Sequence, residues 1–313
     1  GANGLRLLDV SAPTTPTKLG RCSWSGSASD VYVSSSTAYV AAGESGLRVV
    51  DVSDTSNPIE IGFYDTPGLA SSVHVSGDIA YVADGADGGL RIVDVSDAAN
   101  PTELGYHDTI DARDVYVSGA TAYVADPEYQ EVTLLDVSEP GSPAAVGTWD
   151  AVEGTPWRTA VKGDHAYVSD HDGGLWVVDV SEPANPTEVN RHDTPGVIET
   201  VAVAGEYAYT ASLSDDGLWV ADVSEPADVA AVGHYDGLHW ANDLVAVGDY
   251  AYGVSTGSLV VVDVSNPFDP SLAGQNPYGQ GRGVAVSGAY AYIGDYIFRG
   301  LRVIDITSPS RPT

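Results

Sequence analysis

Arginine and aromatic residues occur together at a few points of this acidic sequence, and their chemistry favours the binding of an anion or a sugar. A guanidinium group binds a carboxylate or a sulfate through two parallel hydrogen bonds, and an indole ring stacks on flat or cationic groups. Acidic residues lie at related points, so the arginines could instead only neutralise neighbouring carboxylates. The candidate binding residues are Arg113, Trp157, Arg158, Glu199, His239, Trp240, Asp243 and Arg282.

Two of these residues, Glu199 and Asp243, also suggest a hydrolase. Glycosidases use two carboxyl groups about 5 to 10 Å apart on opposite sides of a cleft. The sequence has no phosphate-binding loop and no His-Glu-x-x-His motif. Cys22 is the only cysteine and is expected to be a small buried hydrophobe. We therefore expect a protein that is not an enzyme, with a hydrolase as one alternative.

Two acidic loops could hold a hard cation such as calcium, which prefers clustered oxygen ligands. Asp84 and Asp87 lie in a glycine-rich stretch, and Asp170 and Asp172 flank a histidine. Neither loop has the alternating Asp ladder ending in Glu of an EF-hand, and such pairs arise by chance in a chain this rich in Asp. We expect no cofactor, with bound calcium as the alternative.

A repeat of about 42 residues must position all of these side chains. Its clearest segment, LRVVDVS at 47–53, recurs at 90–96, 175–181 and 259–265. Each period contains four short runs rich in Val, Ile and Tyr that are typical of strands, separated by turns with Gly, Asp, Asn or Pro. The Asp of the segment precedes a turn in which Asp and Ser accept backbone N–H groups, so we interpret it as scaffold. This residue recurs as Asp9, Asp51, Asp94, Asp136, Asp179, Asp222, Asp263 and Asp305.

Apolar residues on both faces of these strands predict sheets packed between two neighbours, which is the blade arrangement of a propeller. The strand types number seven, seven, seven and eight, which gives seven blades and one strand left over. We predict an all-β, seven-bladed β-propeller with four-stranded antiparallel blades, forming a single domain over residues 1–313. The strand at 17–21 is expected to complete the last blade, whose other strands lie within 283–306, and so to close the ring.

The residues that begin the innermost strands differ from blade to blade and should surround one mouth of the central channel. A residue present in every blade is scaffold, whereas an unusual residue at an equivalent position is a candidate for function. The predicted ring consists of Ser29-Asp30, Ser71-Ser72, Arg113-Asp114, Trp157-Arg158, Glu199-Thr200, Asp243-Leu244 and Arg282-Gly283.

The repeated segment resembles the five-residue signature of the LVIVD repeat family. It reads Leu47-Arg-Val-Val-Asp51, Leu90-Arg-Ile-Val-Asp94 and Leu301-Arg-Val-Ile-Asp305, and the resemblance covers nearly the whole chain. The resemblance implies a β-propeller of the secreted or cell-surface proteins of bacteria and archaea, and it implies no single activity.

The charge of the chain argues against nucleic acid as a partner. With 44 acidic and 13 basic side chains the net charge is −31, and nucleic-acid binding needs clusters of Lys and Arg. Such acidity is typical of salt-loving microbes, and the alternative is an ordinary acidic secreted protein. No run of 18 apolar residues predicts membrane insertion. Without a signal-peptide pattern or any Met, the sequence suggests a mature or excised piece.

These features favour a non-enzymatic interaction platform or structural subunit at the cell surface, with protein partners or copies of itself. A terminal strand without a place in the closing blade could add to another molecule's sheet and build a filament. It could equally fold back, fray or belong to a longer array. The second hypothesis is an anion- or glycan-binding module at the Arg and Trp ring. The candidate assembly residues are Leu5, Leu7, Val10, Leu301, Val303 and Ile306.

Overall fold

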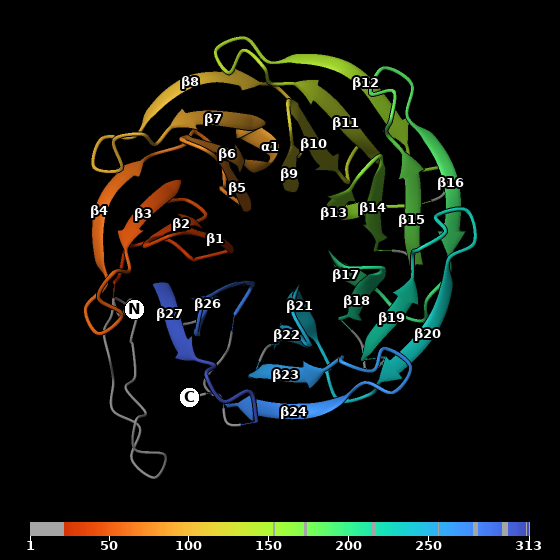
Figure 1. The fold of residues 1–313 in the computed structure, drawn as a ribbon. Coiled ribbons are helices and arrows are strands. Elements are labelled where there is room, and N and C mark those ends of the chain that lie inside the picture. Colours follow the sequence, from red (N-terminus) through yellow and green to blue (C-terminus); the bar gives the residue numbers. More distant parts are fainter. Residues whose placement is uncertain are drawn as a thin grey trace.

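Seven sheets stand around a central axis in the computed structural model, which describes residues 22–152, 154–171, 174–213, 217–255, 257–277, 281–295, 300–310 and 312. The chain passes through the sheets in sequence order, from red to blue in Figure 1. Six sheets have four antiparallel strands, and the seventh has three within the described residues. The predicted all-β, seven-bladed propeller is confirmed.

The strands of each blade run outward from the axis in sequence order (Figure 1). Blade 1 contains β1 (Asp30–Ser34), β2 (Thr37–Ala41), β3 (Leu47–Asp51) and β4 (Ile59–Tyr64). Blade 2 contains β5 (Ser72–Ser76), β6 (Ile79–Ala83), α1 (Gly85–Gly88), β7 (Leu90–Asp94) and β8 (Thr102–His107). Blade 3 contains β9 (Asp114–Ser118), β10 (Thr121–Asp126), β11 (Glu131–Asp136) and β12 (Ala144–Asp150). Blade 4 contains β13 (Pro156–Lys162), β14 (His165–Asp170), β15 (Gly174–Asp179) and β16 (Thr187–His192).

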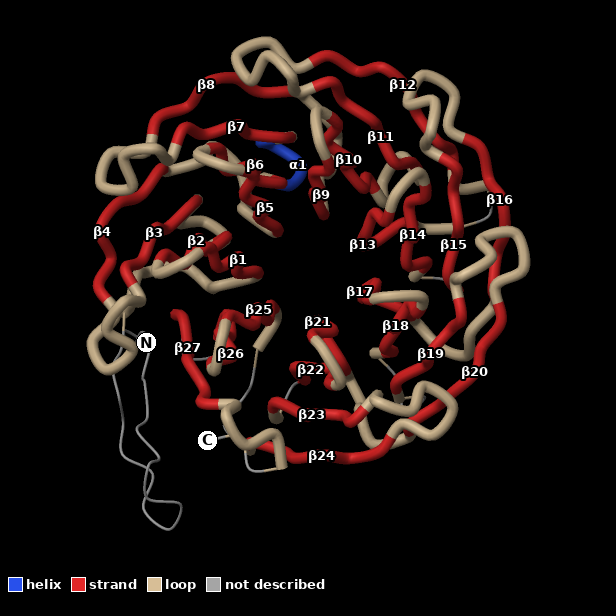
Figure 2. The backbone as a smooth tube through the Cα atoms, viewed as in Figure 1, coloured by secondary structure: helices blue, strands red, loops and turns tan. Residues whose placement is uncertain are grey.

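The remaining blades repeat the pattern. Blade 5 contains β17 (Ile198–Ala204), β18 (Tyr207–Ser212), β19 (Leu218–Asp222) and β20 (Ala230–Tyr235). Blade 6 contains β21 (Ala241–Val247), β22 (Tyr250–Ser255), β23 (Leu259–Asp263) and β24 (Ser271–Asn276). Blade 7 contains β25 (Gly283–Ser287), β26 (Tyr290–Asp295) and β27 (Gly300–Asp305). Figure 2 shows how strands dominate every blade, and no helix among the described residues is long and apolar enough to cross a membrane.

The repeated Asp residues act as turn acceptors at the ends of the third strands. Asp51 Oδ1 accepts the backbone N–H of Ser53 at 2.8 Å, two residues later. This confirms their interpretation as scaffold. The same contact joins Asp94 to Ser96, Asp136 to Ser138, Asp179 to Ser181, Asp222 to Ser224, Asp263 to Ser265 and Asp305 to Thr307.

A glycine in the outermost strand lets the next blade approach closely. At Gly62 an added Cβ would lie 2.1 Å from the Ala98 carbonyl oxygen of the next blade, which a side chain could not tolerate. Blade 4 has Asn190 in this place, and its Nδ2 donates to the Ala227 carbonyl of blade 5 at 2.8 Å. The outer strand therefore contacts its neighbour either through glycine or through this amide.

The first and last blades meet through a shared apolar cluster. Cys22 is buried there, as predicted, with Val31 and Val50 of blade 1 and Tyr292 of blade 7. Cys22 also forms an antiparallel bridge with Leu301, so the chain just after 17–21 lies beside the outer edge of β27. This is the position that the closing strand was predicted to take.

The assembly hypothesis requires that one terminal strand has no place in the closing blade. In the structure β27 occupies the third place of that blade, and its Leu301 and Val303, with the following Ile306, are buried. Leu5, Leu7 and Val10 lie outside the described residues. The assembly role of these residues stays a prediction.

Candidate functional site

The residues at the start of the inner strands form two layers across the axis. The two layers are stacked along the axis, as the register of the inner strands shows. The first of them lies at one open end of the ring, which we call the upper mouth. The upper layer consists of Ser29, Ser71, Arg113, Trp157, Glu199, Asn242 and Arg282. The second layer consists of Asp30, Ser72, Asp114, Arg158, Thr200, Asp243 and Gly283.

This arrangement matches the predicted ring in six blades and corrects it in blade 6. Asp243 was expected in the upper layer with Leu244 behind it, but Asp243 pairs with Val254 and therefore lies in the second layer. The register shifts between Ala241 and Asp243, and this bulge leaves Asn242 at the mouth. Bulges at the same position of blades 4 and 5 involve Trp157 and Glu199.

Arg158 is the centre of the second layer. Its Nη1 lies 3.5 Å from Asp243 Oδ1 and 3.9 Å from the Oδ1 atoms of Asp30 and Asp114. Burial alone would lower the pKa of Arg158, but the carboxylates around it raise that pKa above its usual range. One cation thus faces carboxylates from three other blades.

Each of the same three carboxylates also joins its own blade to the next one. Asp30 Oδ2 accepts the Val73 N–H at 3.0 Å, Asp114 Oδ2 accepts the Thr159 N–H at 2.8 Å, and Asp243 Oδ2 accepts the Val284 N–H at 2.7 Å. Burial raises the pKa of Asp243 to about 6, although Arg158 opposes this, and burial also raises the pKa of Asp114. The second layer is therefore a hydrogen-bonded network that joins six of the inner strands, in three pairs of neighbouring blades.

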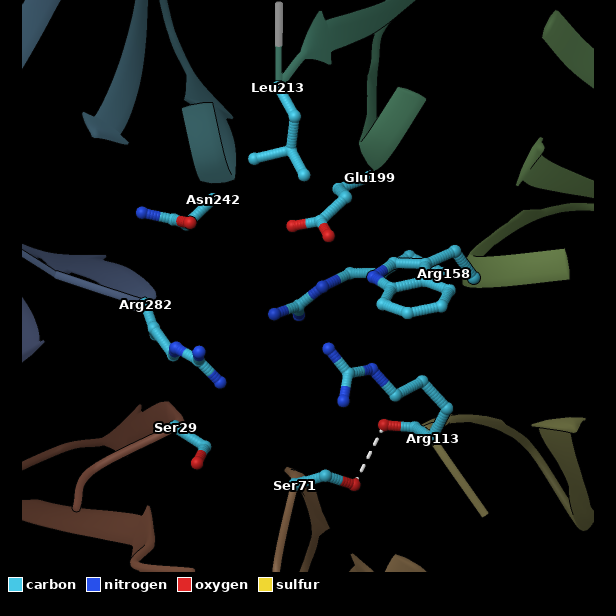
Figure 3. A pocket seen from close by; sticks show the side chains of 9 residues that line it. Ser29, Ser71, Arg113, Arg158, Glu199, Leu213, Asn242 and Arg282 are labelled. Atoms are coloured by element: carbon cyan, nitrogen blue, oxygen red, sulfur yellow. Dashed lines mark hydrogen bonds between the residues drawn. The ribbon is translucent and has the colours of Figure 1, made fainter. Parts of the chain in front are cut away.

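The upper mouth is a cavity of about 190 Å³ directly above this network. Arg113, Arg158 and Arg282 extend towards the same space from three different blades, and Glu199 and Asn242 face it from the other side (Figure 3). The remaining lining residues are Ser29, Ser71, Trp157 and Leu213.

Aromatic packing holds Arg113 and Glu199 in place. The Arg113 guanidinium lies 4.2 Å from the centre of the Trp157 ring. The centres of the Trp157 and His171 rings are 4.6 Å apart. His171 Nε2 in turn lies 3.9 Å from Glu199 Oε1. Burial lowers the pKa of Arg113, with Arg158 acting in the same direction, and burial raises the pKa of Glu199. Trp157 thus supports the cation, with its ring already in contact with two partners.

A second cavity of about 440 Å³ adjoins the upper mouth and shares Ser29, Ser71, Arg113 and Arg282 with it. It extends over the loops of blades 1 to 3. We call this cavity the shelf. Its own lining consists of Ser25, Gly26, Ser27, Gly43, Glu44, Leu69, Ala70, Gly85, Ala86 and Asp111.

A third cavity, of about 350 Å³, lies at the opposite end of the axis, which we call the lower mouth. Tyr32, His74 and Tyr116 form an aromatic arc there, with ring centres 5.0 and 4.8 Å apart. Arg158 lines both this cavity and the upper mouth, so it separates the two.

Two candidates from the sequence lie apart from the upper mouth. His239 and Trp240 occupy the loop before β21, and both are exposed, with a left-handed backbone at Trp240 (φ 56°). Neither residue lines the described cavity. Asn242, two residues later, takes the place that was expected of them.

The acidic loops use their buried carboxylates internally. Asp84 accepts the Thr66 hydroxyl and, at 2.7 Å, the Gly68 N–H. Asp170 accepts the Thr155 N–H at 2.9 Å and the Trp176 Nε1–H at 3.0 Å. Among the described residues no group of three or more His, Cys, Asp or Glu could hold a metal ion. Asp87 is exposed, and Asp172 lies outside the described residues.

Sequence reasoning missed Asn242 and the supporting role of His171. A signal for Asn242 was present, since the apolar residue that follows the second layer is Val31, Val73, Val115 and Val201 in other blades and Leu244 in blade 6. Aligning on that residue places Asp243 with Asp30.

Comparison with known proteins supports the fold and the family. The LVIVD repeat model matches residues 1–23, 25–66, 67–109, 111–151, 153–194, 195–237, 240–276 and 278–313. A search of curated proteins found no significant match.

Several solved structures share the fold at low sequence identity. A protein provisionally named a 6-phosphogluconolactonase, from Bacteroides uniformis ATCC 8492, has a TM-score of 0.73 at 11% identity, over 84% of this chain and 90% of that one. A functionally unknown protein from Desulfotomaculum acetoxidans DSM 771 has a TM-score of 0.69 at 14% identity, over 82% and 88%. The computationally designed Ika8 protein has a TM-score of 0.64 at 10% identity, over 97% and 99%.

At such identities these structures show the propeller fold alone. The family matches, by contrast, follow the repeat from one end of the sequence to the other. The chain therefore belongs to the LVIVD repeat family.

Proposed function

We propose that this protein recognises a small organic anion in its upper mouth, as a binding module and not as an enzyme. The observation that carries the proposal is the convergence of Arg113, Arg158 and Arg282 on one cavity of about 190 Å³. The whole chain has only 13 basic side chains and a net charge of −31. Three arginines around one cavity in such a chain favour recognition of negative charge.

The three arginines have different parts in the proposed site. Arg158 faces three carboxylates of the second layer, so its charge is largely compensated from below. Arg113 is oriented by Trp157, and Arg282 faces the cavity from blade 7 (Figure 3). Arg113 and Arg282 are therefore the residues that we expect to bind the anion directly.

Membership of the LVIVD repeat family supports a secreted or cell-surface setting for this recognition. The extreme acidity is in keeping with a high-salt environment, in which long-range repulsion of an anion is screened within about 3 Å at 1 M salt. Binding would then depend on direct hydrogen bonds inside the cavity.

The hydrolase alternative has less support from the geometry. Of the two carboxyl groups that it requires, Glu199 lines the upper mouth, whereas Asp243 lies in the second layer and accepts the Val284 N–H. An assembly role through the terminal strand remains a separate prediction, which light scattering of the chain with and without residues 1–11 would test.

Titration calorimetry with gluconate and sulfate would test the proposal. Arg113→Gln and Arg282→Gln should each weaken binding roughly 10- to 100-fold, because each removes a hydrogen bond between charged groups. Arg48→Gln is the matched control, since Arg48 pairs with Asp65 on the outer part of blade 1. Binding that is absent at millimolar concentration, or equal in all four proteins, would refute the proposal.

A further inference from the structure

We infer that the anion is the carboxylate of an acidic sugar, a uronic acid residue at the end of a glycan chain. This inference rests on the proposed function of the upper mouth and adds the class of ligand. It depends on the mixture of polar groups in the cavity, on the volume of the cavity and on the adjoining shelf.

The upper mouth contains acceptors as well as cations. Glu199 directs its carboxylate into the same space as the arginines (Figure 3). Asn242 Nδ2 donates to the Gly281 carbonyl at 2.9 Å, and its Oδ1 lies on the side of the cavity. A fully ionised sulfate has no hydrogen to donate to these oxygens, and Glu199 would repel it. A sugar acid offers both a carboxylate for Arg113 and Arg282 and hydroxyl donors for Glu199 and Asn242.

The volume of the upper mouth exceeds what a lone anion requires. About 190 Å³ corresponds to roughly six water molecules at about 30 Å³ each. A single sugar ring with its carboxylate has a size of this order. The lining is mainly polar, with Leu213 and the ring of Trp157 as its apolar groups, so a hydroxylated ligand fits better than an aliphatic acid.

The shelf gives the rest of a glycan a path away from the mouth. It shares Arg113 and Arg282 with the mouth and continues over glycine, serine and alanine residues of blades 1 to 3, where the carboxylates of Glu44 and Asp111 can accept sugar hydroxyls. Small residues leave a surface on which further sugar rings can lie flat. Leu69 is the one large apolar side chain in its described lining. A peptide ending in the mouth would lack side-chain pockets along this path, which favours the glycan.

The first experiment compares D-galacturonate, D-glucose and sulfate by calorimetry on the full chain and on Glu199→Gln. Galacturonate should bind at least roughly tenfold more tightly than sulfate, and glucose should not bind. Glu199→Gln should weaken galacturonate about fivefold, since a charged acceptor becomes a neutral one, and should strengthen sulfate, since a repulsive charge is removed.

The second experiment uses the shelf variant Ala86→Tyr and a trisaccharide of one terminal galacturonate on two neutral galactose units, because Glu44 and Asp111 of the shelf would repel further carboxylates. The trisaccharide should bind more tightly than the monosaccharide, and Ala86→Tyr should remove this gain while leaving the affinity for the monosaccharide unchanged. Ala86 is exposed on α1 and lines the shelf without lining the mouth, so the variant should fold normally.

The outcomes separate the two proposals. Sulfate or gluconate binding that needs Arg113 and Arg282, together with galacturonate no tighter than sulfate, would overturn the acidic sugar and keep the anion site. Tighter binding of a tripeptide through its free carboxylate would overturn it as well. If no anion binds, the proposed function and this inference both fail.

Discussion

The two mouths of the propeller use the same inner strands to present opposite chemistry. The upper mouth gathers Arg113 and Arg282 beside a single carboxylate, Glu199. The lower mouth has the aromatic arc of Tyr32, His74 and Tyr116 next to the carboxylates of the second layer. Burial lowers the pKa of His74 to about 4, so at neutral pH this histidine adds no positive charge. Positions that repeat in the scaffold thus carry different side chains where the axis opens to solvent.

Arg158 divides these two environments and compensates the carboxylates below it. Its guanidinium lines both cavities and lies within 3.9 Å of Asp30, Asp114 and Asp243. The difference between the mouths therefore depends on a structural network between them. Changes to that network should affect stability, whereas changes in the upper layer should affect binding.

The largest effect is expected from Arg158→Met. Removing the cation leaves three buried carboxylates facing one another, and breaking a buried ion pair on one side costs about 3 to 5 kcal/mol. The unfolding free energy, measured by denaturant titration at neutral pH, should fall by that amount. Arg48→Met is the control, because its ion pair with Asp65 reaches solvent and should cost about 1 kcal/mol or less.

A double variant guards this prediction against a simple packing defect. Adding Asp243→Asn to Arg158→Met removes one of the three opposed charges and should restore part of the lost stability. Two results would contradict the role given to Arg158. In the first, Arg158→Met loses no more unfolding free energy than Arg48→Met. In the second, the double variant is less stable than Arg158→Met, because the losses of the two single variants add.

A smaller effect is expected when the unfolding free energies of the wild type and Asp243→Asn are compared as a function of pH. The pKa of Asp243 is raised from its ordinary 3.8 to about 6, so its contribution to stability is complete below about pH 4 and is lost as the pH rises through about 6. A shift of this size corresponds to about 2 to 3 kcal/mol. Between pH 4 and pH 7.5 the wild type should lose this much more unfolding free energy than Asp243→Asn, as measured by denaturant titration at each pH.

His74 contributes in the opposite sense, because its lowered pKa favours folding above pH 6.5 and that contribution is lost as the pH falls towards 4. It is present in both proteins and cancels in the comparison. Asp94→Asn is the control, since the Ser96 hydrogen bonds lower the pKa of Asp94 and its effect lies below pH 4. Parallel pH profiles for wild type and Asp243→Asn would contradict the buried network.

The sequence predicted the features that repeat. The four strands expected in each period are present, for example as β4, β5, β6 and β7. The Asp turns and the burial of Cys22 were also predicted, because they depend on local turn chemistry and on the apolar character of the side chain. Repetition supplies this information many times over.

The sequence could not predict how the non-repeating side chains divide into layers. A bulge before Asp243 shifts the register by one residue, and a shift of one moves a side chain between the upper mouth and the network below it. Arg158 was predicted as a ligand-binding residue, with neutralisation of carboxylates as the alternative, and its contacts with Asp30 and Asp114 agree with the alternative. These contacts join blades far apart in sequence. Such contacts depend on the closed ring and leave no local pattern.

The most direct test of the upper mouth as an anion site is a crystal structure of the full chain grown with selenate, which anomalous scattering locates, and then transferred to galacturonate. We expect a selenate peak between Arg113 and Arg282 above Arg158, and its displacement by galacturonate. Selenate bound only at other surfaces, with the mouth occupied by water before and after the transfer, would contradict it.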